Sequence, residues 1–335
     1  MALRDIIGQD RAINILIRTI ERERIPSSYL FAGESGIGKK FTAINLAKAV
    51  NCQKGGTDAC DECSSCKKID AGIHPDFLLI SHEDGQIKIE EIRAIDDVLS
   101  FKAFESRKKV VIVDEAEAMN PFAANAFLKT LEEPPADSLI ILISSNPDRL
   151  PDTIKSRCSR INFTPLSHEA CKKVIETAGS RQKMRKAEDQ KSSGFPVSQT
   201  PSLLVRLSMG RPGTAIEREL IEEREWCINL LKGMLAAEKD GWTSKEEMER
   251  WFDLALILLR DMAILKITQD ETHLVNIDLK DYLHNSSSSI DLKVIIENYQ
   301  ALNTLKGYLN FNLNKSLTWN YTGSLLRKTM DARYA

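Results

Sequence analysis

Short apolar runs and amphipathic stretches alternate along the first 165 residues of the chain. Helical periodicity lies between most of the apolar runs and also precedes them, as in Asp10–Ile20. Such alternation predicts a parallel sheet that is covered by helices on both faces. The predicted strands are Tyr29–Ala32, Phe77–Ser81, Val110–Val113, Leu139–Ser144 and Arg160–Phe163.

The pattern changes after residue 165, and from residue 218 onward only helical periodicity remains. Trp251–Ile267 is apolar nearly all round, and residues 290–313 carry apolar side chains at helical spacing. Between the two regions, residues 179–202 are rich in Lys, Arg, Ser and Gln, which predicts a flexible, solvated insertion. Ser286–Ser289 is predicted to be a turn within the helical region.

Composition places the chain among globular proteins with two or three domains. It has 335 residues, of which 42% are hydrophobic and 28% charged. The net charge of −2 gives no overall basic field, so any affinity for DNA must come from a local patch or from partners. The N-terminus has no signal-peptide core, and no apolar segment is long enough to span a membrane. We therefore expect a cytoplasmic protein without a membrane partner.

The octapeptide GESGIGKK follows the first predicted strand and opens into a helix-forming segment. Gly33, Gly36 and Gly38 would let backbone N–H groups close around phosphate oxygens, and Lys39 would reach the β- and γ-phosphates. The pattern G-x-x-x-x-G-K-[ST] is met except at its last position, where Lys40 replaces the hydroxyl that binds Mg²⁺. The alternative is an ordinary glycine-rich turn. The sequence predicts a phosphate loop for ATP and Mg²⁺ that is degenerate.

Four of the seven cysteines lie within fifteen residues. Cys52, Cys60, Cys63 and Cys66 have the spacing C-x7-C-x2-C-x2-C. In a reducing compartment this cluster predicts metal binding before disulfides, and four thiolates satisfy tetrahedral Zn²⁺. Free thiols or a redox pair are the alternatives. Because four protein ligands fill the coordination sphere, we expect the zinc to be structural.

Three further sets of polar residues follow predicted strands or a short helix. Asp114 and Glu115 end an apolar strand, where in a P-loop enzyme the Asp holds Mg²⁺ and the Glu orients the attacking water. Ser145 and Asn146 end the next strand, where a polar side chain could sense the γ-phosphate. Arg157 follows a short helical stretch. The first and the last have an ordinary alternative, since Asp-Glu after an apolar run is common and an exposed Arg is usually only solvated.

These motifs together resemble bacterial clamp-loader subunits of the AAA+ class, which belong to DNA polymerase III. The resemblance covers about the first 215 residues, and its most specific part is the block NAFLKTLEEPP at 125–135, supported by GIHPD at 72–76 and SRC at 156–158. It implies a nucleotide-binding-type domain at 1–165 with an inserted zinc module at 52–66. A small helical lid at 166–217 and a helical collar at 218–335, which holds a heteropentameric ring, would follow.

The resemblance also implies partners and residue roles. The partners would be DnaX (tau/gamma) ATPases, a delta subunit, the sliding clamp and, through the assembled complex, primed DNA. Ser145 matches the family's sensor position, and Arg157 matches its arginine finger, which acts on a neighbouring subunit's ATP. Asp114 and Glu115 would then be vestigial, although their retention leaves residual ATP binding or slow hydrolysis open.

Departures from the ATPase pattern distinguish the kinds of subunit. Lys40 lacks a hydroxyl, and Gly213 occupies the register in which ATPase subunits carry a sensing Arg. The segment His74-Pro75-Asp76 and the run from Gly210 to Ala215 both look like the delta-prime kind, whose own ATPase activity is expected to be weak or absent. The alternative is an active DnaX-like ATPase. A stand-alone zinc and DNA-binding protein is disfavoured by the net charge.

Overall fold

The computed structural model describes residues 1–81, 85–188, 200–217, 220–238, 241–288, 290–311 and 313–327. The chain forms two compact units. The first comprises Met1–Ser180 and Gly210–Thr214, and the second comprises Arg181–Met209 and Ala215–Ala335. Among the described residues, no helix is both long enough and apolar enough to cross a membrane.

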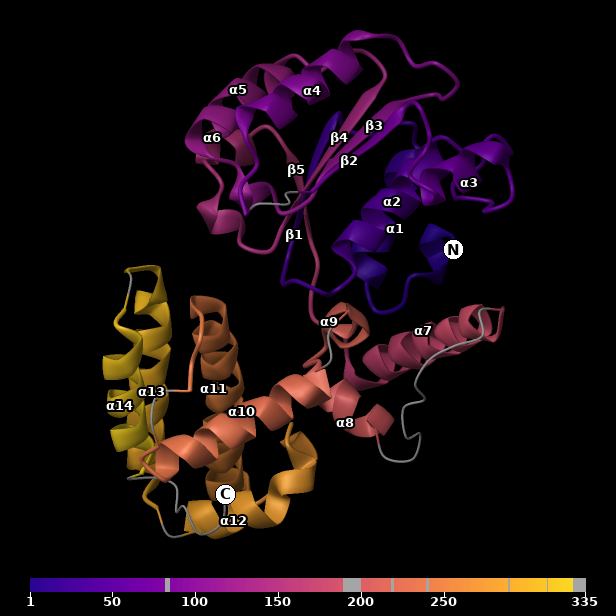
Figure 1. The fold of residues 1–335 in the computed structure, drawn as a ribbon. Coiled ribbons are helices and arrows are strands. Elements are labelled where there is room, and N and C mark those ends of the chain that lie inside the picture. Colours follow the sequence, from indigo (N-terminus) through magenta and orange to yellow (C-terminus); the bar gives the residue numbers. More distant parts are fainter. Residues whose placement is uncertain are drawn as a thin grey trace. The chain divides into compact units, whose positions relative to one another are not determined.

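A five-stranded parallel sheet forms the centre of the first unit, with the strand order β2-β3-β4-β1-β5 (Figure 1). The middle strands β1, β3 and β4 are buried along their whole length, which explains why they read as continuous apolar runs. The strands are β1 (Ser28–Ala32), β2 (Phe77–Ile80), β3 (Lys109–Val113), β4 (Ser138–Ser144) and β5 (Ser159–Asn162).

The register of the strands brings three loops together at one edge of the sheet. Ala32 at the end of β1 pairs with Ser144 at the end of β4, and Val113 at the end of β3 pairs with Leu142. All strands are parallel, so their carboxyl ends meet at this edge. The residues that follow β1, β3 and β4 therefore lie where α/β proteins bind ligands.

Helices cover both faces of the sheet. In Figure 1, α4, α5 and α6 lie on one face, and α1 and α2 lie on the other. Alternate residues of β1, β3 and β4 pack with α4–α6 in one buried cluster that includes Ile95, Phe127 and Ile154. The helices that lie wholly or mainly in this unit are α1 (Asp10–Glu21), α2 (Lys39–Val50), α3 (Ser64–Asp70), α4 (Ile89–Ser100), α5 (Pro121–Glu132), α6 (Asp152–Lys155) and α7 (His168–Glu188); the 3-10 helices are η1 (Leu3–Asp5), η2 (Ala116–Ala118) and η3 (Pro147–Arg149).

The second unit is helical throughout its described residues. Helix α11 is buried on most sides, and its Trp251 packs edge-on against Trp242, which in turn packs against Trp319 of α14. Its helices, together with the boundary helix α9, are α8 (Thr200–Leu207), α9 (Pro212–Glu217), α10 (Leu220–Leu235), α11 (Lys245–Thr268), α12 (Lys280–Ser288), α13 (Leu292–Tyr308) and α14 (Lys315–Leu326); the 3-10 helices are η4 (Glu271–His273), η5 (Ile277–Leu279) and η6 (Leu309–Phe311).

The parallel sheet, the helices on both of its faces and the helical C-terminal region confirm the predicted fold class. Two details differ. The predicted turn at Ser286–Ser289 is wrong, because α12 continues to Ser288; Ser286 and Ser287 are buried in the second unit. The predicted insertion begins inside α7, which continues to Glu188, and its remainder at 189–199 lies outside the described residues.

Candidate functional site

The phosphate loop lies between β1 and α2, as predicted, and is in contact with residues 210–214. Gly36 has φ of 75°, and its carbonyl oxygen accepts a hydrogen bond of 2.8 Å from the backbone N–H of Gly213. A Cβ atom at Gly213 would lie 2.9 Å from the Cα of Gly36. No side chain therefore fits at position 213 without a shift of the backbone. The position that would carry the sensing Arg is packed directly against the phosphate loop.

Lys39 forms hydrogen bonds with the backbone of the phosphate loop to which it belongs. Its side chain is only 6% exposed, and its Nζ donates hydrogen bonds to the carbonyl oxygens of Gly33 (2.6 Å) and Glu34 (2.5 Å). Burial lowers the pKa of Lys39, while the carboxylates of Glu117 and Asp114 partly oppose that shift. The ammonium therefore stabilises the loop's own backbone.

Lys40 is the residue that differs from the phosphate-loop pattern, and it contacts the carboxylate that the pattern assigns to Mg²⁺. Its Nζ lies 3.1 Å from Asp114 Oδ2. Asp114 is held directly after β3, because its N–H donates to the carbonyl of Ile80 (2.8 Å). Glu115 follows with φ of 50°, and its N–H donates to Asp114 Oδ1 (3.1 Å). The structure thus places a fixed positive charge beside Asp114.

Glu117 belongs to the same edge of the sheet and was not singled out from the sequence. Its Oε1 accepts hydrogen bonds from Ser145 N (2.8 Å), Ser145 Oγ (2.5 Å) and Asn146 N (3.0 Å). Burial raises the pKa of Glu117, but these hydrogen bonds outweigh it and hold the pKa below its usual value. The hydroxyl at the predicted sensor position is therefore bound to a carboxylate of the chain itself.

Arg157 follows the short helix α6. Its backbone N–H donates to the carbonyl of Ile154 (3.1 Å), which closes the end of that short helix. The side chain is 33% exposed and forms an ion pair with Glu132, the last residue of α5. The guanidinium also donates to the carbonyl of Thr153 (2.8 Å). Arg157 is thus a surface cation in a defined position.

The four predicted cysteines converge on one point. Potential ligand atoms of Cys52, Cys60, Cys63 and Cys66 all lie within 4.8 Å of one another, and Cys52 and Cys66 are buried. A tetrahedral zinc with bonds of about 2.3 Å places its sulfurs ~3.8 Å apart, so small adjustments suffice for a metal ion. The N–H groups of Cys63 and Cys66 point at the sulfurs of Cys60 (3.3 Å) and Cys63 (3.5 Å). The cluster can hold a metal ion.

Electrostatic contacts attach the cysteine module, residues 52–66, to the phosphate-loop helix. Lys48 of α2 is almost fully buried, and its ammonium pairs with Asp61 of the module and with Asp70 of α3 (2.9 Å). Burial lowers the pKa of Lys48, but the two carboxylates outweigh it and raise the pKa above its usual value. The module is therefore fastened to the same helix that the phosphate loop opens.

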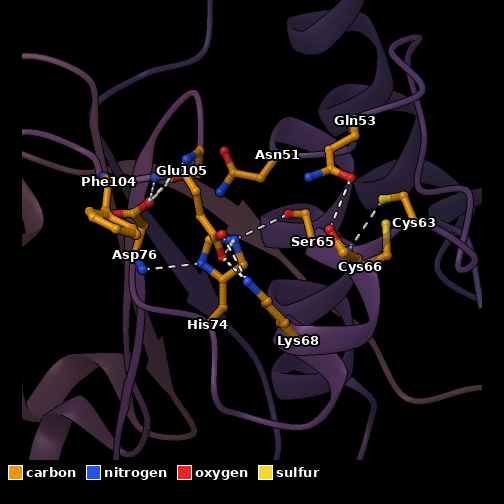
Figure 2. Close-up of polar contacts among 12 residues, drawn as sticks. Asn51, Gln53, Cys63, Ser65, Cys66, Lys68, His74, Asp76, Phe104 and Glu105 are labelled. Carbon is orange, nitrogen blue, oxygen red and sulfur yellow. Dashed lines mark hydrogen bonds and ion pairs between the residues drawn. The ribbon is translucent and has the colours of Figure 1, made fainter.

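Helix α3 continues from the module into a polar network around His74 (Figure 2). Burial lowers the pKa of His74, which favours the neutral ring, while the carboxylates of Glu105 and Asp76 oppose that shift. Its Nδ1 accepts the backbone N–H of Asp76 (3.1 Å), and therefore the ring proton lies on Nε2, which faces Ser65 Oγ at 3.3 Å and Glu105 at 3.6 Å. Lys68 of α3 also binds Glu105 (2.6 Å). These contacts join α3 to the loop before β3.

Asp76 anchors that loop. The carboxylate is 1% exposed and accepts four hydrogen bonds, which come from the backbone N–H groups of Phe104, Glu105 and Ser106 and from the Ser106 hydroxyl. Burial raises the pKa of Asp76, but the hydrogen bonds hold it below its usual value. The sequence signalled residues 72–76 only through a family resemblance, and the structure assigns their His and Asp a structural role.

The strand order, the phosphate loop after β1 and the acidic pair after β3 define a P-loop protein of the AAA+ class. The family described as "DNA polymerase III, delta subunit" matches residues 8–167. The delta' subunit of Bacillus subtilis is 30% identical over 318 residues, which cover 91% of this chain and 92% of that protein. The delta' subunit of Pseudomonas aeruginosa is 32% identical over 305 residues, covering 87% and 88%. The chain therefore belongs to the delta' family of DNA polymerase III clamp-loader subunits.

The tau and gamma subunits of DNA polymerase III are similar over a shorter stretch. The tau subunit of Bacillus subtilis is 37% identical over 167 residues, which cover 50% of this chain and 30% of that protein. The similarity to delta' subunits, in contrast, continues through the helical C-terminal region. The DnaX-like alternative therefore fits the chain less well than the delta' assignment.

Proposed function

We propose that this chain acts in the clamp loader as a subunit that does not hydrolyse ATP itself. It assembles with DnaX ATPases and a delta subunit in a heteropentameric ring, and it helps them to open the sliding clamp and place it on primed DNA. The similarity to delta' subunits along nearly the whole chain supports this role.

The ion pair between Lys40 and Asp114 is the observation that carries the proposal. P-loop enzymes use this carboxylate and the missing hydroxyl to hold Mg²⁺, which neutralises charge on the transferred phosphoryl group. Here the ammonium of Lys40 lies 3.1 Å from the carboxylate, and Gly213 supplies no cation to the γ-phosphate. Two electrostatic contributions to the transition state are therefore missing. We infer that ATP, if it binds this loop, is not turned over there.

We further propose that Arg157 acts on a neighbouring subunit's ATP. A guanidinium at the surface can neutralise charge on the γ-phosphate across a subunit interface, and arginine fingers supplied in trans are worth about 10³–10⁵ in rate in related NTPases. The defined position and partial exposure of Arg157 support this role. A subunit with a passive nucleotide site still serves the ring in this way.

The metal of the cysteine module is proposed to be Zn²⁺. Four thiolates suit zinc better than the harder magnesium or calcium, and they leave no open coordination position for catalysis. The ion would hold together the segment after α2 and the first turn of α3. It would stabilise the folded module and take no part in ATP turnover.

Steady-state hydrolysis of ATP by the purified chain tests the proposed passive site. We expect turnover at the background level, with no difference between the wild type and Glu115→Gln, because the site lacks its Mg²⁺ hydroxyl and its γ-phosphate cation. Analysis of nucleotide bound to the purified chain separates binding from turnover. Steady hydrolysis that Glu115→Gln abolishes would overturn the proposal and favour the DnaX-like alternative.

A further inference from the structure

Three contacts hold the guanidinium of Arg157 on its own subunit. Nη2 pairs with Glu132 Oε1, and Nη1 donates to the carbonyl of Thr153 (2.8 Å) and to Ser156 Oγ (3.4 Å). Among the described residues, the N–H of Nε and the second N–H of Nη2 have no partner. An arginine has five such N–H donors in a planar fork. The contacts therefore orient the guanidinium and leave two of its five N–H donors available to a phosphate oxygen.

Glu132 stands at a position that ordinarily disfavours an anion. It is the last residue of α5, and the C-terminal end of a helix carries partial negative charge, so a carboxylate there is unfavourable unless a cation compensates it. The chain supplies that cation from Arg157, which follows α6 and lies 25 residues further along the sequence. Apart from this pair, the Glu132 side chain forms no hydrogen bond or ion pair among the described residues.

We propose that Glu132 is a positioning residue that holds Arg157 ready for the neighbouring subunit's ATP. The inference rests on the proposed role of Arg157 as an arginine finger. Because Glu132 takes one N–H of Nη2 and Thr153 takes one of Nη1, the phosphate does not have to displace either contact. The guanidinium is thus oriented before the ring assembles, and its flexible side chain loses less conformational freedom when the phosphate binds.

A purely structural ion pair predicts different behaviour. Both side chains are partly exposed, at 33% for Arg157 and 49% for Glu132, and exposed pairs of this kind contribute little to stability. Loss of Glu132 should therefore leave folding and ring assembly intact. If Glu132 positions Arg157, loss of Glu132 instead lowers the turnover rate at the neighbouring subunit's ATP site, and it does so only when Arg157 is present.

The experiment uses the complete clamp loader reconstituted with variants of this chain. Glu132→Ala should lower kcat of the ATPase stimulated by clamp and primed DNA by about three- to tenfold, with little change in KM for ATP. Glu133→Ala is the matched control, because it removes the adjacent exposed carboxylate, and it should leave the rate unchanged. In an Arg157→Ala background, Glu132→Ala should cause no further loss. A wild-type rate for Glu132→Ala, or losses that multiply in the double variant, would overturn the proposal.

A second measurement on the isolated chain tests whether Glu132 holds the Arg157 side chain, whether or not Arg157 acts as an arginine finger. Nitrogen-15 relaxation of the Arg157 Nε–H should show a rigid side chain in the wild type and in Glu133→Ala, and a mobile one in Glu132→Ala. An Arg157 that is equally mobile in all three would contradict the positioning role. If Arg157→Ala leaves the loader's ATPase unchanged, the arginine finger is wrong even where the relaxation data show that Glu132 holds the side chain.

Discussion

Lys40 and Lys39 both use their ammonium groups inside the chain. Lys39 binds the carbonyl oxygens of Gly33 and Glu34, and Lys40 pairs with Asp114. A phosphate loop ordinarily directs its lysine and its bound Mg²⁺ at the nucleotide. Here the ammonium groups of Lys39 and Lys40 already have partners within the chain. This is consistent with a loop that has a structural role.

Replacement of Lys40 by threonine tests how many defects the nucleotide site carries. Lys40→Thr supplies the Mg²⁺ hydroxyl and frees Asp114, but position 213 still lacks a cation. We therefore expect tighter binding of Mg²⁺-ATP and a turnover that stays at the background level. Lys40→Met is the control, because it removes the charge without adding a hydroxyl. Steady ATP hydrolysis by Lys40→Thr would show that position 40 alone accounts for the inactivity.

The residues of this site differ in how far the sequence reveals them. Lys40 and Arg157 lie in short motifs whose chemistry can be read locally. Glu117 and Glu132 cannot be found in that way, because their roles depend on partners 28 and 25 residues away. The packing of Gly213 against Gly36 could not be predicted from the sequence either. The sequence shows only that position 213 lacks the sensing Arg of ATPase subunits.

At the scale of elements, the central strands β1, β3 and β4 were predictable because buried parallel strands read as continuous apolar runs. The cysteine module was predictable from its spacing alone, and the structure brings its four thiols together. The turn predicted at Ser286–Ser289 was wrong, because a run of serines usually indicates a turn, yet here tertiary packing buries Ser286 and Ser287 within α12.

The cysteine module gives a prediction about metal content. Elemental analysis of protein purified without chelator should find stoichiometric zinc in the wild type, which Cys66→Ser loses. Cys158→Ser should keep it, because Cys158 lies outside the cluster. Zinc removal should lower the free energy of unfolding by less than the ~10–16 kcal/mol of isolated zinc modules, because the rest of the domain supports the segment. Absence of zinc with four freely titratable thiols would contradict the assignment.

The loop anchored by Asp76 gives a prediction about pH. The pKa of Asp76 is held below its usual value, so its carboxylate stabilises the fold above about pH 4 and loses that effect as pH falls through the lowered pKa. Asp76→Asn should reduce the free energy of unfolding at pH 7 by about 2–3 kcal/mol and flatten its decline in acid. Urea titrations at pH 7 and in acid measure both effects. Asp97→Asn, an exposed carboxylate, is the control, and equal values for the two variants would contradict the anchor.

Domain boundaries were harder to predict than elements. The sequence predicts three domains that divide near residues 165 and 217, whereas the chain forms two compact units in which Gly210–Thr214 belongs to the first. That segment returns to the first unit because Gly213 hydrogen-bonds the phosphate loop. A contact between residues so far apart in the sequence leaves no local pattern from which the boundary could be predicted. The helical lid at 166–217 and the helical collar at 218–335 stay predictions.

At the scale of the whole molecule, the account holds that this subunit serves its neighbour's ATP and not its own. The most direct test is the complete clamp loader assembled with Arg157→Ala, in which the ATPase stimulated by clamp and primed DNA and the rate of clamp loading are measured. We predict normal assembly with at least a tenfold loss of clamp loading, since an arginine finger is worth about 10³–10⁵ at its own site. Normal rates in an intact complex would contradict the account.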